Sequence, residues 1–260
     1  MALEFPTRAE RPGKLPHADS LATPWPEFMY HDPVLKRLFG RVIAEYAEFQ
    51  FYLWDDEREE VVGGGNAIPA AWDGDGASLP DGGVDVVVEA RFAEGPPTPT
   101  VLCALQILIA PECRGQGLSS RMIERMREIG RAHGLDTLIA PVRPTLKHRY
   151  PLTPIDSYIA WRRPDGTLLD PWLRTHERLG AEIVKVAPES MRVAGTVGAV
   201  GGDGVSRPAP TSCRARWCRS RSTASGTRGS TWSPTSGWCT RLARQSDEPA
   251  ANLHALKAGN

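Results

Sequence analysis

The sequence lacks the features that assign a chain to a nucleic-acid or membrane class. Lysine and arginine together number 31 in its 260 residues, and so do aspartate and glutamate, so the formal net charge is zero. A balanced chain gives no reason to expect nucleic acid or a membrane surface as a general partner. No apolar run is long enough to span a bilayer, and the first residues contain no apolar core of a secretory signal. We therefore expect a cytoplasmic protein without a membrane partner.

Cysteine and nucleotide-binding motifs are equally uninformative. The five cysteines are an odd number, and no Cys-x-x-Cys pair or spaced Cys/His pattern indicates zinc. We expect reduced thiols without a function and no metal. Neither Gly-x-x-x-x-Gly-Lys-Ser/Thr nor Gly-x-Gly-x-x-Gly occurs, which excludes a P-loop and a dinucleotide fingerprint.

The most informative stretch is Ile109-Ala-Pro-Glu-Cys-Arg-Gly-Gln-Gly-Leu-Ser119. The apolar residues 101–109 predict a buried strand that leads into it. The residues 118–133 predict an amphipathic helix, because its apolar side chains fall on one face. A strand therefore leads through a tight glycine loop into a helix. Main-chain N–H groups and the helix dipole make such a loop a site for a pyrophosphate.

This loop resembles a family motif. The order Arg114-x-x-Gly117-x-Ser119, with Pro111 before it, is similar to the motif by which GNAT-superfamily acyltransferases hold the pyrophosphate of acetyl-CoA. Ser119 departs from the usual glycine or alanine, but it is small. The alternative interpretation is an ordinary glycine turn. The resemblance implies acetyl-CoA or another acyl-CoA as cosubstrate. The residues that it implies for cofactor binding are Ile109, Pro111, Arg114, Gly115, Gln116, Gly117, Leu118 and Ser119.

A second segment, Thr175–Ala181, also resembles the family. GNAT enzymes commonly have Leu-Tyr-x-x-x-Gly-Phe here, and His176 stands in place of the tyrosine, with Gly180 in place of the glycine. The resemblance implies that His176 is the general acid that protonates the departing CoA thiolate. An unperturbed histidine has a pKa near neutrality, which suits this role. The alternative is a histidine without a role, either exposed or at the edge of the core.

The remaining chemistry is less well defined by the sequence. Main-chain N–H groups on the strand that ends near Ile109 are expected to polarise the thioester carbonyl. The sequence does not select a general base. Candidates for that base are Glu112, His148, Tyr150 and Tyr158, and candidates for the acceptor pocket are Asn66, Trp72, Arg143 and Lys147.

The order of elements predicts an α/β fold: a GNAT-like mixed central sheet with helices on both faces. Residues 1–27 read as an irregular, proline-punctuated N-terminal arm, and 28–198 as the acyltransferase domain. A helix is expected from Asp32 and Pro33, and the glycines 63–65 predict a bulge or a close approach of another backbone. Residues 84–93 read as helix or strand. Strands are expected at 49–54, from 61, and at 101–109, 137–140, 181–186 and 191–197, and helices at 118–133, 155–161 and 170–179.

Residues 199–260 differ from the rest in composition. Between 201 and 245 the aliphatic residues other than alanine are Val205 and Leu242. The same segment contains eight arginines and a single acidic residue, Asp203. This predicts a low-complexity, disordered tail. A shift of the reading frame by one base would place apolar residues at alternating positions at 218–222, 230–232 and 236–238. We therefore expect that the chain was read out of frame after about residue 198 and lacks the last strand of the sheet.

Three functions follow as hypotheses. The first is an acyltransferase that moves an acetyl or other acyl group from acyl-CoA to an amine acceptor, either a small molecule or a peptide. The second is a catalytically inactive GNAT-like module that binds acyl-CoA. The third, which rests on the tail alone, is an arginine-rich nucleic-acid-binding protein. The sequence leaves a homodimer open.

Overall fold

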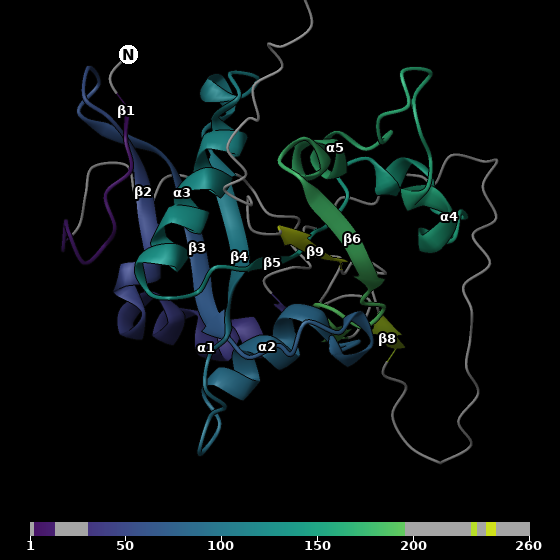
Figure 1. Cartoon of the computed structure of the whole chain (residues 1–260), viewed down its shortest axis with the longest axis horizontal. Helices are drawn as coiled ribbons and strands as arrows, with labels where there is room; N and C mark the ends of the chain where they lie inside the picture. The colour runs from purple at the N-terminus through teal and green to yellow at the C-terminus, as the bar shows by residue number, and fades with distance from the viewer. Residues whose placement is uncertain (1–2, 14–30, 196–229, 233–237, 243–260) are drawn as a thin grey trace, which may run out of the picture.

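The computed structural model describes residues 3–13, 31–195, 230–232 and 238–242 (Figure 1). A mixed sheet forms its centre, with helices packed on both faces, as the sequence predicts. The strands are β1 (Leu3–Glu4), β2 (Gln50–Asp55), β3 (Glu60–Ala70), β4 (Val101–Ile109), β5 (Leu138–Pro141), β6 (Ala181–Val186), β7 (Val193–Gly195), β8 (Ser230–Trp232) and β9 (Trp238–Leu242). The α-helices are α1 (Pro33–Glu45), α2 (Gly83–Arg91), α3 (Leu118–Ala132), α4 (Ile155–Ile159) and α5 (Pro171–Arg178). No helix of this described part combines the length and apolarity needed to cross a bilayer.

The main sheet has the strand order β1-β2-β3-β4-β5-β9-β6. Every neighbouring pair is antiparallel except β4 and β5, which run parallel. A parallel pair needs a crossover connection, and α3 provides it. The predicted strand at 101–109 and the helix that follows it are confirmed. Residues 84–93, which the sequence predicts as either helix or strand, are mostly helical, because α2 covers Gly83–Arg91.

The two faces of the sheet carry different helices. Phe51, Leu102 and Met122 belong to the core between the sheet and α3, and Figure 1 shows α3 lying along β3 and β4. Val42 and Val88 belong to a second core, in which α1 and α2 pack on the opposite face. A third core lies under α4 and α5. α3 is amphipathic in the way its sequence predicts: one face is buried and its arginines and glutamates lie mostly on the other.

Local chemistry fixes the start of α1. Asp32 is extended, and its carboxylate accepts hydrogen bonds from the main-chain N–H groups of Val34 and Leu35 at 2.9 Å each. Pro33 occupies the first helical position, where no N–H donor is needed. The helix predicted from Asp32 and Pro33 is therefore confirmed.

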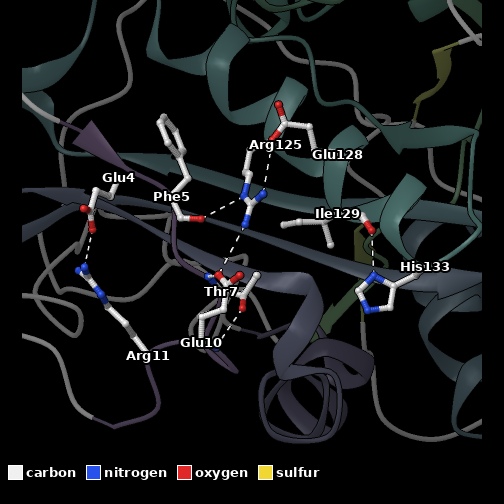
Figure 2. Close-up of polar contacts among 9 residues, drawn as sticks. All are labelled: Glu4, Phe5, Thr7, Glu10, Arg11, Arg125, Glu128, Ile129 and His133. Atoms are coloured by element: carbon white, nitrogen blue, oxygen red, sulfur yellow. Dashed lines mark hydrogen bonds and ion pairs between the residues drawn. The ribbon is translucent and has the colours of Figure 1, made fainter.

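The N-terminal arm is more regular than the sequence predicts. β1 forms the edge of the main sheet and pairs with β2, and an isolated bridge joins Thr7 to Phe51. Figure 2 shows how Arg125 of α3 holds the arm: its Nε donates to the Phe5 carbonyl at 3.0 Å, and its guanidinium lies 3.6 Å from the Glu10 carboxylate. The expectation of an irregular arm is wrong for Leu3–Glu4, which form a strand, whereas residues 5–13 contain one bridge, turns and bends. Residues 14–27 of the predicted arm lie outside the described residues.

The expectation that the chain lacks the last strand is also wrong. β9, within the segment predicted to be disordered, lies between β5 and β6 and pairs antiparallel with both. Main-chain hydrogen bonds define a strand in such a gap, so side-chain alternation is not required. β7, predicted at 191–197, is shorter and pairs with β8 in a separate two-stranded sheet. The rest of the tail lies outside the described residues, and the division at residue 198 and the reading-frame hypothesis stay predictions.

The glycines in β3 permit close packing. A Cβ built on Gly65 would lie 2.3 Å from Cζ of Phe51 and 2.8 Å from Cε of Met126. A Cβ on Gly63 would lie 2.7 Å from the Leu108 carbonyl oxygen. The predicted close approach is therefore confirmed at these positions. The register shifts lie beside the glycines, between Leu53 and Trp54 on β2 and between Asn66 and Ala67 on β3.

Candidate active site

The N-terminus of α3 is open to a ligand. Its N-cap is Gly117, in the left-handed region at φ 73°, with no side-chain hydrogen bond to cap the helix and no acidic residue in the first turn. The first N–H groups of any helix lack intrahelical partners, and the helix dipole adds positive potential there. A Cβ on Gly115 or Gly117 would meet no atom of the described residues within 4 Å. The loop therefore has room around Gly115 and Gly117, next to the N–H donors of the first helical turn, which suits an anion.

The predicted loop residues are gathered at this helix end. β4 ends at Ile109, and Pro111 opens the 3-10 turn Pro111–Cys113. The Arg114 Nε donates to the Ile109 carbonyl at 3.2 Å, so this side chain folds back across the loop. Leu118 is buried and anchors the start of α3 in the core. Gly115, Gln116 and Gly117 are exposed, and Ser119 is partly buried.

β4 and β5 separate directly beside this loop. The two strands pair only through Leu102 and Cys103 on β4 among the residues that the structure describes, so residues 104–109 of β4 are not paired with β5. β4 also bulges, because Asn66 pairs with Gln106 and Ala67 pairs with Ala104, which leaves Leu105 unmatched. The edge of β4 from Ala104 to Ile109 can therefore accept an extended, amide-bearing ligand that ends at the helix N-terminus.

His176 lies in α5 and is buried, with 3% of its surface exposed. Its ring contacts Trp172 edge to face, with 4.6 Å between the ring centroids. Burial lowers the pKa of His176 to about 4, so the ring is neutral at pH 7. Trp172 and Ala104 both pack against the cores under α3 and under α4 and α5. His176 is thus next to the junction where β4 leaves β5, rather than at the surface loop.

The buried carboxylate of Asp170 organises the segment between β5 and α5. Asp170 caps α5, and it also accepts from the Leu146 N–H and the Tyr158 hydroxyl at 2.8 Å each. Burial, and then the hydrogen bond to Asp170, raise the pKa of Tyr158 above its usual range. Tyr158 is therefore a structural donor, which removes it from the candidates for the general base.

The other candidates are separated by their surroundings. Glu112 is exposed. Trp72 belongs to the core under α1 and α2, and its Nε1 donates to the Asp75 carbonyl at 2.7 Å, so it is structural. Burial lowers the pKa values of Arg143 and Lys147, and the Lys147 ammonium donates to the Tyr150 carbonyl at 2.9 Å.

Sequence reasoning missed Gln106. Its Oε1 accepts a hydrogen bond of 2.7 Å from Nδ2 of Asn66, beside the bulge. The available signal was a single amide side chain within an otherwise apolar strand, Val-Leu-Cys-Ala-Leu-Gln-Ile-Leu-Ile. The wider role of Asp170 was missed too, because its contacts with Leu146 and Tyr158 depend on the tertiary fold.

Comparison with known proteins agrees with this geometry. A family model described as the acetyltransferase (GNAT) family matches residues 17–153. The arginine N-acetyltransferase avaD from Aspergillus versicolor is 31% identical over 186 residues, which are 65% of this chain and 63% of that protein. The chain therefore spans less than two thirds of the length of this relative.

Two solved structures share the fold. The loading GNATL domain of CurA from Lyngbya majuscula has a TM-score of 0.51 at 20% identity, over 74% of this chain and 90% of that one. The GphF GNAT-like decarboxylase in complex with isobutyryl-CoA has a TM-score of 0.50 at 17% identity, over 72% of this chain and 89% of that one. At such identities the likeness shows the fold alone.

Proposed function

The chain belongs to the GNAT acetyltransferase family, and on this premise we propose that it transfers an acetyl group from acetyl-CoA to a primary amine. The observation that carries the proposal is the uncapped N-terminus of α3 behind Gly115 and Gly117. It offers N–H donors and a positive dipole end to a pyrophosphate, and no acidic side chain in the first turn opposes the negative charge. Arg114 adds a cation beside the same loop.

The route of the reaction follows from the strands. Acyl-CoA lies along the free edge of β4, with its pyrophosphate at the Gly115–Ser119 amides and its thioester near the bulge at Leu105. Main-chain N–H groups at the bulge polarise the thioester carbonyl. The amine nitrogen attacks the carbonyl carbon, the carbon–sulfur bond breaks, and the nitrogen loses a proton. The net products are the acetylated amine and CoA with its thiol protonated. Holding both reactants in place supplies much of the acceleration.

His176 enters this proposal as a hydrogen-bond donor to the departing thiolate. Because burial holds its pKa near 4, the imidazolium is scarce at neutral pH. A neutral imidazole still carries one N–H, which stabilises a thiolate without full proton transfer. The proton that leaves the amine then reaches the sulfur through solvent. This modifies the role of general acid that the family resemblance implies.

The name of the relative suggests arginine as the first acceptor to test. The chain is incubated with acetyl-CoA and arginine, and then with a panel of small amines and peptides; free CoA thiol and acetylated product are both measured. Equal amounts of thiol and acetylated amine support the proposal. Binding of acetyl-CoA without any product from the panel would favour the inactive acyl-CoA-binding module instead. The cytoplasmic location and a homodimer stay predictions.

A further inference from the structure

The amide side chains of Asn66 and Gln106 form a polar pair in an apolar part of the sheet. They are directly opposite each other in the β3–β4 register, and Asn66 Nδ2 donates to Gln106 Oε1 at 2.7 Å. Both side chains are partly buried, so the pair is neither fully desolvated nor freely hydrated. The bond leaves Asn66 Oδ1 as an acceptor and Gln106 Nε2 as a donor for a further partner.

The pair faces away from α3. Side chains alternate along a strand, and a Cβ on Gly65 would point at Phe51 and Met126 on the α3 side. Asn66 therefore points to the opposite face, which it shares with Ile68 of the core under α1 and α2. The next residue on that face toward the loop is Gly64, which has no side chain. On its loop side the amide pair therefore has no β3 side chain beside it, and Leu108 of β4 lies opposite Gly64.

Its position along β4 matches that of the thioester in the proposed reaction. Gln106 directly follows the unmatched Leu105 and lies beyond Cys103, the last β4 residue that pairs with β5. The strand runs about 10 Å from Gln106 to Ile109, at about 3.3 Å per residue. The pyrophosphate loop begins there, so an extended acyl-CoA would bring its acyl end back to the level of the pair.

We propose that Asn66 and Gln106 bind the acceptor amine in its neutral form, with Asn66 Oδ1 accepting one N–H so that the nitrogen lone pair is directed at the thioester. This rests on the proposed acetyl transfer. A neutral amide oxygen stabilises an ammonium less than a carboxylate does. β3 and β4 carry no carboxylate except Glu60, six residues before Asn66. These strands therefore select an amine that has already lost its extra proton.

A preference among amines follows. A peptide α-amine has an unperturbed pKa of about 8 and a lysine side-chain amine about 10.4, so near pH 7.5 the neutral fraction of the α-amine is on the order of a hundredfold larger. The acceptor class that this pair fits is accordingly a primary amine of low pKa. The rate below the amine pKa should rise about tenfold per pH unit.

Two substitutions test the pair on the full chain, with an acceptor that the wild type acetylates. Gln106→Glu keeps an acceptor oxygen for Asn66 and adds a carboxylate that can remove a proton from the amine. It should therefore weaken the pH dependence of kcat/KM and raise activity at pH 6.5 about tenfold, a low value for base catalysis. Asn66→Ala should raise the KM of the amine about tenfold, which corresponds to the loss of about one hydrogen bond. It should leave the affinity for acetyl-CoA unchanged. Glu45→Gln, on the exposed face of α1, is the control for a changed carboxylate.

The outcomes separate this inference from the proposed function. One outcome is that the wild type transfers acetyl groups, but the pH profile of kcat/KM of Gln106→Glu superimposes on the wild-type profile. Another is that Asn66→Ala leaves the KM of the amine unchanged. In either case the amide pair does not bind the acceptor. A parallel loss of acetyl-CoA affinity in Asn66→Ala would make the pair part of the cosubstrate site and overturn the inference. If the wild type acetylates no amine, both proposals fall.

Discussion

The Tyr158 hydroxyl donates a hydrogen bond of 2.8 Å to Oδ2 of Asp170, and both side chains are buried. The same carboxylate accepts from the main-chain N–H groups of Leu146, Trp172 and Leu173. One aspartate therefore joins the segment after β5, helix α4 and the first turn of α5. The arrangement holds α5, and with it His176, beside the point where β4 and β5 separate.

Tyr158→Phe should destabilise the fold by about 1–2 kcal/mol, because it removes one donor from a buried carboxylate. Urea denaturation measures the free energy of unfolding. Tyr150→Phe is the matched control, since this tyrosine belongs to the same aromatic group but is 37% exposed. Equal effects of the two substitutions would mean that the hydrogen bond to Asp170 contributes nothing beyond the ring.

Asp85 should make the fold less stable as the pH rises. Asp85 is buried in the first turn of α2, near Asp32 and Glu89, and its Oδ2 accepts from the Arg192 N–H at 3.0 Å. Burial raises its pKa to about 7. Because the folded protein holds this proton more tightly than the unfolded chain, the contribution of Asp85 to stability is complete below pH 3.8, its ordinary pKa. The contribution is lost as the pH rises through about 7.

Asp85→Asn should therefore match the wild type near pH 4 and exceed it at pH 8. The difference should be on the order of 4 kcal/mol, since the pKa is raised by about three units and each unit corresponds to about 1.4 kcal/mol. Thermal unfolding over this pH range measures it. Glu94→Gln, an exposed carboxylate shortly after the same helix, is the control and should change little. A pH-independent difference between Asp85→Asn and the wild type would contradict the account.

His176 should have the opposite pH dependence. Its folded pKa of about 4 lies below the ordinary 6.5, so its contribution is present above pH 6.5 and is lost as the pH falls to 4. His176→Phe should remove this loss on acidification. The same substitution should lower turnover by about ten- to a thousandfold, the scale of a lost proton-transfer or hydrogen-bonding group. Unchanged turnover together with the altered pH dependence of stability would make His176 structural.

β9 gives a prediction for truncation. A chain that ends at residue 198 loses the strand between β5 and β6, which leaves each with an unpaired edge. It should unfold at a lower temperature than a chain that ends at residue 242, which keeps β9. Equal melting temperatures for the two chains would show that β9 does not contribute to the sheet.

The parts of the fold with clear periodicity were predictable from sequence. The apolar run of β4, the amphipathic face of α3 and the aspartate–proline starts of α1 and α5 each follow from short-range rules. The glycine loop was predictable because its residues are consecutive. β9 was not, since its pairing is made by main-chain groups between strands far apart in the chain.

The candidate site was predictable from the sequence only where its residues lie close together along the chain. The resemblance that drew attention to His176 carries no information about its burial, which shifts its pKa and changes the chemistry that it can perform. Gln106 lies opposite Asn66 only because β3 and β4 pair with a bulge between them. Both facts require the packed sheet, so neither is available from spacing along the chain.

The most direct test of the account is calorimetry of acetyl-CoA binding to the wild type, Gly117→Asp and Gly134→Asp. Both glycines are left-handed, at φ 73° and 74°, and a Cβ on either would meet no described atom within 4 Å, so the backbone strain is matched. Gly117→Asp places bulk and negative charge at the N-terminus of α3, whereas Gly134 follows its C-terminal end. We predict that Gly117→Asp loses most of the affinity and Gly134→Asp keeps it. Equal affinity in a folded Gly117→Asp protein would contradict the assignment of acyl-CoA to this loop.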